Sequence, residues 1–82
     1  MSSELTVYTT SWCPYCRALK RQLGELGLEF TEIDIDADAA AAQIVQSLNN
    51  GNRTVPTVVF SDGSTLTNPS GPAVAARLAQ LG

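Results

Sequence analysis

Hydrophobic and polar positions alternate over two segments in the first half of the chain, and between these segments they recur at helical spacing. Leu5 to Thr10 and Leu28 to Ile35 each place apolar side chains on one face, which predicts two strands. Between them, leucines at i, i+4 and i+7 predict a helix from Pro14 to about Leu26 that Gly27 ends. The first half therefore has the order strand, helix, strand.

Helical spacing returns in residues 36 to 51, where either Asp36 or Asp38 can serve as the N-cap of a second helix. Three apolar residues of this segment fall on one predicted helical face: Ile44, Val45 and Leu48. The segment ends in asparagine and glycine, which are common at helix C-termini. We expect this apolar face to pack against the sheet.

Two short strands and a third helix complete the chain. Asp62-Gly63 lies inside the segment Pro56 to Thr67, and this dipeptide favours a type I′ turn between two strands. Ser70 to Leu81 predicts a helix that Ser70 caps, with Pro72 near its start.

The predicted elements follow the order βαβαββα, and we treat residues 1 to 82 as a single domain. A helix between the first two strands implies a right-handed parallel pair, and the last hairpin adds antiparallel strands. The expected fold is α/β, a four-stranded mixed sheet flanked by three helices.

Charge and length exclude several classes of partner. With a net charge of −3 and five basic residues, the chain lacks the positive surface that holds phosphate backbones, so we expect no nucleic acid partner. No stretch approaches the roughly 20 apolar residues that cross a bilayer, and the N-terminus does not resemble a signal peptide. We expect a cytoplasmic protein with no membrane partner.

The chain has two cysteines and no histidine. A metal site normally needs four ligands, so we expect no metal held by this chain alone. The absence of histidine also removes the general base of Cys/His hydrolases and serine triads. A structural bridge is disfavoured, because the cytosol keeps thiols reduced and so short a loop constrains the unfolded chain little. The chemistry must therefore run on the thiols.

Cys13 and Cys16 form a Cys-Pro-Tyr-Cys motif between a predicted strand and a predicted helix, which is typical of redox proteins. Cys13 falls at the helix N-terminus, where unpaired N–H groups favour a thiolate, and we expect it to be the exposed nucleophile. Pro14 suits the first helical position. Cys16 lies one turn further along, where its thiol can attack a disulfide formed at Cys13.

Side chains around this pair are candidate substrate contacts. Trp12 and Tyr15 offer flat surfaces that we expect to be partly exposed, although either ring could instead pack into the core. Three basic residues follow the motif and could support a thiolate or an anionic substrate: Arg17, Lys20 and Arg21. For Lys20 and Arg21, a solvated basic face with Arg21 paired to Glu25 explains the same pattern.

Val55 and Pro56 form a second candidate segment, just before a predicted strand. The sequence alone does not distinguish a cis from a trans bond between them. A cis bond would turn the Val55 backbone outward, free to pair with an extended substrate lying against Cys13.

The start of the last helix is the third candidate segment, and its residues could hold a carboxylate or a sugar hydroxyl. Three polar residues lie there: Thr67, Asn68 and Ser70. Helix capping explains the same residues without a ligand.

WCPYC at residues 12–16, TVP at residues 54–56 and the order of elements together resemble the glutaredoxin branch of the thioredoxin fold, across essentially the whole chain. This resemblance implies a cis bond before Pro56, with the proline facing Cys13.

Residues 47–70 are further similar to the mycoredoxins, glutaredoxin-like proteins of bacteria that use mycothiol instead of glutathione. Two departures from ordinary glutaredoxins agree with this. Thr10 stands where a lysine often precedes the active site, and LTNPS at residues 66–70 replaces the Gly-Gly and acidic pair that hold glutathione.

The resemblance to mycoredoxins implies a monothiol mechanism. Cys13 attacks the mycothiol sulfur of a mycothiolated protein, releases the protein thiol and keeps the mycothiol. A second mycothiol restores Cys13, and a separate mycothiol disulfide reductase that uses NADPH reduces the mycothiol disulfide. The chain would then bind no cofactor and act as a monomer, with a Cys13–Cys16 disulfide as a side state.

Two alternatives remain open. One is a dithiol electron donor for ribonucleotide reductase, itself reduced by thioredoxin reductase, against which Trp12 and the TNPS segment weigh. The other is an iron-sulfur carrier, in which Cys13 from two chains and two external thiols hold a [2Fe-2S] cluster. The proline within CPYC weighs against this carrier.

Overall fold

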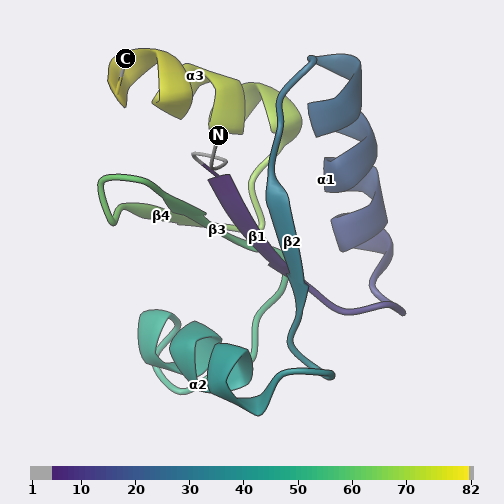
Figure 1. Ribbon diagram of the computed structural model, residues 1–82, viewed down its shortest axis with the longest axis vertical. Coiled ribbons are helices and arrows are strands. Elements are labelled where there is room, and N and C mark those ends of the chain that lie inside the picture. The colour runs from purple at the N-terminus through teal and green to yellow at the C-terminus, as the bar shows by residue number, and fades with distance from the viewer. Residues whose placement is uncertain (1–4, 82) are drawn as a thin grey trace.

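The computed structural model describes residues 5–81, which form four strands and three helices. The sheet has the strand order β2-β1-β3-β4 (Figure 1). Its strands are β1 (Leu5–Thr9), β2 (Thr31–Asp34), β3 (Thr57–Phe60) and β4 (Thr65–Thr67). Because β1 runs parallel to β2 and antiparallel to β3, which is antiparallel to β4, the predicted mixed sheet is confirmed.

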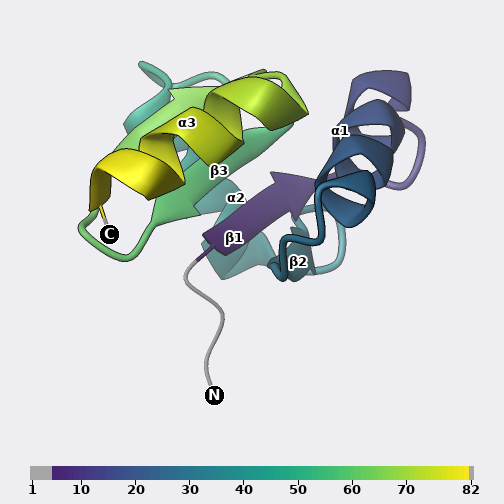
Figure 2. The ribbon, with the colours of Figure 1, turned by 90° about the horizontal axis from the view of Figure 1, so that it is seen from above.

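The helices are α1 (Pro14–Glu25), α2 (Ala39–Leu48) and α3 (Gly71–Leu81), which gives the predicted order βαβαββα. α1 and α3 pack together on one face of the sheet, and α2 covers the other face (Figure 2). The predicted α/β fold is therefore confirmed. Within the described residues, no helix is both long enough and apolar enough to cross a membrane.

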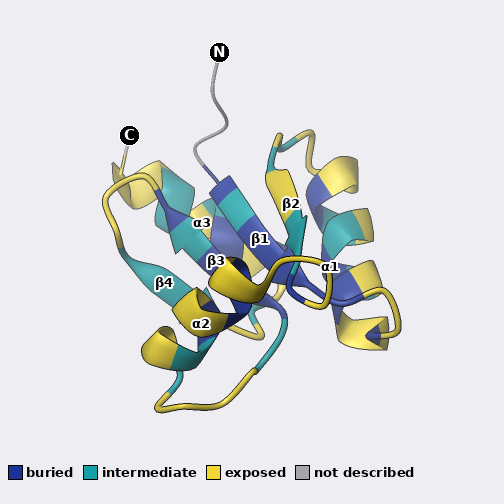
Figure 3. Cartoon of the chain, turned by 60° about the horizontal axis from the view of Figure 1, so that its bottom comes forward, coloured by how far each residue is buried: buried dark blue, intermediate teal, exposed yellow. Residues whose placement is uncertain are grey.

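The sheet separates two clusters of buried side chains, and β1 is buried between them (Figure 3). Because neighbours along a strand point to opposite faces, Val7 and Tyr8 enter different clusters. The cluster under α1 and α3 contains Leu5, Val7, Leu19, Leu23, Val58, Phe60 and Val74. The cluster under α2 contains Tyr8, Ile35, Ala41, Ala42 and Val45.

The buried face of α2 differs from the predicted one. Val45 is fully buried, but Ile44 and Leu48 are 45% and 41% exposed. Ala41 and Ala42 face the sheet in their place. Side chains at i, i+1 and i+4 share one side of a helix, so Ala41, Ala42 and Val45 together form the buried side of α2.

β2 is shorter than predicted, because Leu28 and Phe30 pack against the core from a loop instead of extending the strand. After β2, Asp38 is the N-cap of α2, and its Oδ1 accepts a hydrogen bond from the N–H of Ala41 at 3.1 Å. Asp38, and not Asp36, is therefore the cap of α2, and the side chain of Asp36 does not cap this helix.

The predicted type I′ turn at Asp62-Gly63 is wrong. The N–H of Phe60 donates to the carbonyl of Ser64 at 2.9 Å, so the loop runs from Ser61 to Gly63. Gly63 has a φ of 88° whereas Asp62 has no positive φ, and a type I′ turn needs positive φ at both central residues. Instead, Oδ1 of Asp62 accepts hydrogen bonds from the N–H of Ser64 at 2.9 Å and from its hydroxyl at 2.6 Å, which holds the longer loop.

Candidate active site

Cys13 is the N-cap of α1, at the end of the turn that follows β1. Pro14 takes the first helical position, as predicted. The N–H of Cys16 donates to Sγ of Cys13 at 3.2 Å, in the way that an N–H of the first turn donates to a serine or aspartate cap. The first turn of α1 therefore directs an N–H group at the sulfur of Cys13, where it stabilises developing negative charge.

Both thiols are buried, which corrects the prediction that Cys13 is exposed. Cys13 is 3% exposed, and Cys16 is fully buried. The capping position folds the Cys13 side chain back over the helix N-terminus, and the segment at Val55 lies against it. Trp12 and Tyr15 flank the pair with 66% of each residue exposed, so neither ring packs into the core.

The Cys13 thiol donates to the carbonyl of Val55 with a sulfur–oxygen distance of 3.9 Å. The Val55–Pro56 bond is cis, in agreement with the isomer that the resemblance to glutaredoxins implies. On the other side of this segment, the N–H of Asn68 donates to the carbonyl of Pro56 at 2.7 Å. Within residues 5–81 no backbone group of Val55 pairs with another backbone group, so its N–H is available to a ligand beside Cys13.

A chain of polar contacts joins Trp12 to a loop that the sequence analysis did not assign to the site. The indole N–H of Trp12 donates to Oδ2 of Asp36 at 3.1 Å, and Oδ1 of Asp36 lies 3.5 Å from Nη2 of Arg53. The same Nη2 donates to the carbonyl of Ile35 at 3.5 Å. Arg53 lies two residues before Val55, and Trp12 directly precedes Cys13. Both ends of this chain of contacts are therefore close in sequence to residues of the thiol site.

The order of elements contains a signal for the Trp12–Asp36 contact. β1 and β2 are parallel, and residues that follow the carboxyl ends of parallel strands gather at one edge of a sheet. Trp12 follows β1 and Asp36 follows β2, so the topology alone brings them to the same edge. Nothing in the local pattern identifies Arg53, because its contact depends on how the segment before Pro56 folds back.

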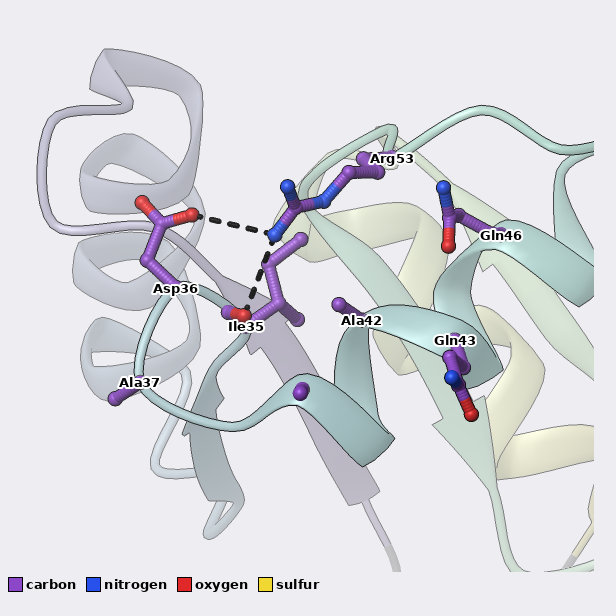
Figure 4. A pocket seen from close by; sticks show the side chains of 8 residues that line it. Ile35, Asp36, Ala37, Ala42, Gln43, Gln46 and Arg53 are labelled. Carbon is purple, nitrogen blue, oxygen red and sulfur yellow. Dashed lines mark hydrogen bonds and ion pairs between the residues drawn. The ribbon is translucent and has the colours of Figure 1, made fainter.

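A pocket of about 390 Å³ opens beside these contacts, and we call it the α2 pocket (Figure 4). Four polar side chains line it: Asp36, Gln43, Gln46 and Arg53. Ile35 and alanines supply its apolar surface. Amide groups both donate and accept hydrogen bonds, so this lining suits a ligand rich in hydroxyl groups.

The family model named Glutaredoxin matches residues 5–64. The chain belongs to the glutaredoxin family. It is a thiol-disulfide oxidoreductase, and Cys13 and Cys16 are the only two cysteines that can do this chemistry. The family's substrates are thiols and disulfides.

Two relatives cover nearly the whole of this glutaredoxin. A Mycobacterium tuberculosis protein described as a glutaredoxin is 53% identical over 81 residues, which are 99% of this chain and 96% of the relative. Mycoredoxin 1 of Corynebacterium glutamicum is 48% identical over 79 residues, which are 96% of this chain and 98% of the relative. The predicted resemblance to mycoredoxins is confirmed.

Solved structures show the same fold. The glutaredoxin-like NrdH-redoxin of Escherichia coli superposes with a TM-score of 0.73 at 29% identity, over 90% of this chain and 92% of that protein. A glutaredoxin of Archaeoglobus fulgidus superposes with a TM-score of 0.74 at 25% identity, over 90% of this chain and 84% of that protein. The predicted thioredoxin/glutaredoxin fold is confirmed.

The two thiols of this glutaredoxin differ in electrostatic environment. Burial, together with a hydrogen bond to Cys13, raises the pKa of Cys16 to about 12. The backbone of Thr10 and the charge of Lys20 oppose this rise but do not cancel it. Cys16 therefore stays a neutral thiol near pH 7, whereas Cys13 is the thiol at the helix N-terminus.

Lys20 forms an ion pair that joins α1 to β2. Its Nζ lies 2.8 Å from Oε2 of Glu32, and the hydroxyl of Thr9 donates to the same oxygen at 2.8 Å. The hydrogen bond from Lys20 is the main cause that lowers the pKa of Glu32. Arg17 is exposed and makes no ion pair within residues 5–81, so its role toward a substrate stays a prediction.

Thr67 makes a contact within the fold. Its hydroxyl donates to Oδ1 of Asn49 at 2.7 Å, and the amide nitrogen of Asn49 donates in turn to the carbonyl of Val45 at 2.9 Å and to the hydroxyl of Thr57 at 3.1 Å. This network ties the end of α2 to β3 and β4. Thr67 is nevertheless exposed, next to Asn68, which contacts the Pro56 segment.

Ser70 caps α3, as predicted, since its hydroxyl accepts a hydrogen bond from the N–H of Ala73 at 3.2 Å. It lines a second groove, between α1 and α3, together with Gln22 and Pro72. Gln22 lies nine residues after Cys13, which is roughly 13 Å along the helix. The structure therefore brings Asn68 to the Pro56 segment but places Ser70 along the side of α1.

Proposed function

We propose that this glutaredoxin reduces mixed disulfides between proteins and mycothiol, by a monothiol mechanism that uses mycothiol as the reductant. The observation that carries the monothiol part is the difference between the two thiols. Cys13 receives an N–H bond from the helix N-terminus at 3.2 Å, whereas burial keeps Cys16 protonated. The choice of mycothiol is supported by the 48% identity to Mycoredoxin 1 over nearly the whole chain.

In the first step, the sulfur of Cys13 attacks the mycothiol sulfur of the mixed disulfide. A bond forms between these two sulfurs, the original disulfide breaks, and the client protein leaves as a thiolate. The backbone of Val55 beside Cys13 can pair with the cysteine part of mycothiol. The α2 pocket, with amides at Gln43 and Gln46, can receive its sugar part.

In the second step, a further mycothiol attacks the mycothiol sulfur held on Cys13. The products are mycothiol disulfide and the Cys13 thiolate, so the protein itself undergoes no net oxidation. A separate reductase that uses NADPH would return the mycothiol disulfide to mycothiol, and the chain would bind no cofactor of its own. We propose that it works in the cytoplasm as a monomer, where client proteins and mycothiol meet it.

The similarity to the Escherichia coli NrdH-redoxin, described as having a thioredoxin-like activity profile, favours one second candidate. In that case the chain would be a dithiol electron donor that thioredoxin reductase reduces directly. Both cysteines would then be required, because the electrons would leave and return through a Cys13–Cys16 disulfide.

The test uses Cys16→Ser with a mycothiol mixed disulfide, mycothiol, mycothiol disulfide reductase and NADPH. NADPH oxidation is followed at 340 nm, in parallel with a glutathione system. We expect turnover with mycothiol to exceed turnover with glutathione. Turnover with glutathione but not with mycothiol would indicate an ordinary glutaredoxin that uses glutathione. The dithiol donor would be favoured if Cys16→Ser shows no turnover in either system while wild type supports NADPH oxidation with thioredoxin reductase.

A further inference from the structure

Arg53 presents a guanidinium group in the α2 pocket (Figure 4). A guanidinium offers a fork of N–H donors that matches a carboxylate, and arginine pairs with carboxylates more strongly than with neutral groups. If Arg53 were free, the pocket would favour a thiol that carries a carboxylate. Its occupation by a group of the protein itself would remove that preference.

Asp36 supplies such a group. Its Oδ1 lies 3.5 Å from Nη2 of Arg53, and its Oδ2 accepts the indole N–H of Trp12 at 3.1 Å. The indole therefore holds the carboxylate with one oxygen toward the guanidinium. Of residues 5–81, Asp36 is the one acidic residue that lines the pocket. The other polar side chains there are Arg53 and the amides of Gln43 and Gln46. A carboxylate brought to Arg53 would have to displace Asp36 and would also meet its charge.

We propose that Asp36 is a specificity-determining residue, which occupies Arg53 and so selects against thiols with a free carboxylate in favour of a neutral, hydroxyl-rich thiol. The inference deepens the proposed function, since it concerns which small thiol the same site accepts. Mycothiol presents sugar hydroxyls beyond its sulfur, whereas glutathione presents carboxylates. Asp36 would thus contribute to discrimination without touching the reacting sulfur atoms.

The expected size of this effect is modest. The side chains of Arg53 and Asp36 are 51% and 47% exposed, and ion pairs at such positions are screened by water. We therefore expect a change of about three- to tenfold in reaction rate when the charge of Asp36 is removed. Asp36→Asn is the informative variant, because its amide oxygen can still accept the indole N–H of Trp12 while the charge is lost.

The test is a single-turnover reaction of reduced protein in the Cys16→Ser background. Cys13 attacks a symmetric disulfide, forms a mixed disulfide with one half and releases the other half as a thiolate. Three disulfides are compared by quenched flow and intact mass: oxidised glutathione, oxidised glutathione with all of its carboxylates esterified, and mycothiol disulfide. We expect Asp36→Asn to raise the second-order rate constant for oxidised glutathione about three- to tenfold. The esterified form and mycothiol disulfide should change by less than about twofold.

Two variants serve as controls. Glu29→Gln removes one negative charge from an exposed residue outside the pocket and should leave all three rate constants unchanged. Adding Arg53→Gln to Asp36→Asn should cancel the gain with oxidised glutathione, because the gain depends on the freed guanidinium.

The proposal is overturned if Asp36→Asn leaves the rate with oxidised glutathione unchanged. It is also overturned if the esterified form gains equally, which would indicate altered Cys13 reactivity, or if Glu29→Gln gives the same rise. The decision rests on the two glutathione forms alone. If the Cys16→Ser protein with Asp36 intact does not react with mycothiol disulfide, that result counts against the proposed function and leaves the comparison of the two glutathione forms intact.

Discussion

The N–H of Cys16 donates to Sγ of Cys13 at 3.2 Å, so each cysteine of the motif shapes the environment of the other. Cys13 gains an N–H donor from the first turn of α1. Cys16 lies beneath it, where burial and the bond to Cys13 hold its proton. The helix N-terminus therefore assigns different roles to two identical side chains.

This difference predicts unequal effects of replacing the two cysteines. Cys13→Ser should lower the turnover of a small mixed disulfide by at least about a hundredfold, because a serine hydroxyl is a far weaker nucleophile than a thiolate. Cys16→Ser should keep turnover within about threefold of wild type under the monothiol mechanism. Steady-state assays at pH 7.5 with equal protein concentrations measure both. A Cys13→Ser protein within about tenfold of wild type would disprove the nucleophile assignment.

The raised pKa of Cys16 predicts a loss of stability in alkali. The ordinary pKa is 9.0 and the folded value is about 12, so the unfolded chain releases this proton first as pH rises. The contribution of Cys16 is fully present below pH 9.0 and is lost as pH rises toward 12, with a slope of at most about 1.4 kcal/mol per pH unit.

Urea unfolding of wild type and Cys16→Ala between pH 7 and pH 11 tests this contribution together with the coupling of Cys16 to Cys13. The free energy of unfolding of wild type should fall more steeply above pH 9 than that of Cys16→Ala. Parallel curves would mean that the thiol ionises as easily in the folded protein as in the unfolded chain.

The thiol motif was predictable because its signals are local. A strand that runs into Cys13, a proline at the first helical position and leucines at helical spacing determine where the motif lies, and α1 begins at Pro14 as predicted. The burial of Cys13 was not predictable, because it depends on contact with Val55, more than forty residues away along the chain. Local pattern thus located the nucleophile but not its surroundings.

Other differences also arise from contacts distant in sequence. Asp62-Gly63 favours a two-residue turn in isolation, but pairing of Phe60 with Ser64 sets the hairpin register and lengthens the loop. Ile44 and Leu48 are apolar at helical spacing, yet the sheet contacts the neighbouring alanine side of α2. Asp36 offered a cap signal, and only the folded chain reveals its contact with Trp12.

The ion pair between Lys20 and Glu32 predicts a loss of stability in acid. The lowered pKa of Glu32 means that the folded chain keeps this carboxylate ionised below the ordinary value of 4.5. Its stabilisation is therefore fully present above pH 4.5 and is lost as pH falls through the lower folded value. Both side chains are about one-third exposed, so we expect only about 0.3–1 kcal/mol.

Glu32→Gln tests this contribution, with Glu29→Gln as the matched control that removes an exposed charge outside any ion pair of residues 5–81. At pH 7, Glu32→Gln should unfold at lower urea than the control. The gap should close as pH falls below 4.5 and should narrow in 0.5 M salt. If Glu32→Gln is still less stable than Glu29→Gln at pH 2.5, the lost stability comes from the Thr9 contact or from packing, not from the ion pair.

Two glycines predict opposite effects of the same substitution. A Cβ at Gly71 would lie 2.6 Å from Cβ of Gln22, where α1 and α3 meet, and the N–H of Gly71 donates to Oε1 of Gln22 at 2.6 Å. Gly71→Ala must push the helices apart, which should cost about 1–3 kcal/mol. A Cβ at Gly24, inside α1, would meet nothing within 4 Å, so Gly24→Ala should stabilise by about 0.5–1 kcal/mol.

Thermal and urea unfolding of both variants measure these changes, and each variant is a control for the chemical change in the other. Turnover should stay near the wild-type level in Gly24→Ala, which lies outside both pockets and the thiol site. If Gly71→Ala matched wild type, α1 and α3 would have room that the 2.6 Å approach denies. If both variants increased the free energy of unfolding equally, backbone entropy alone would explain the two effects. The close approach of α1 and α3 at Gly71 would then not affect stability.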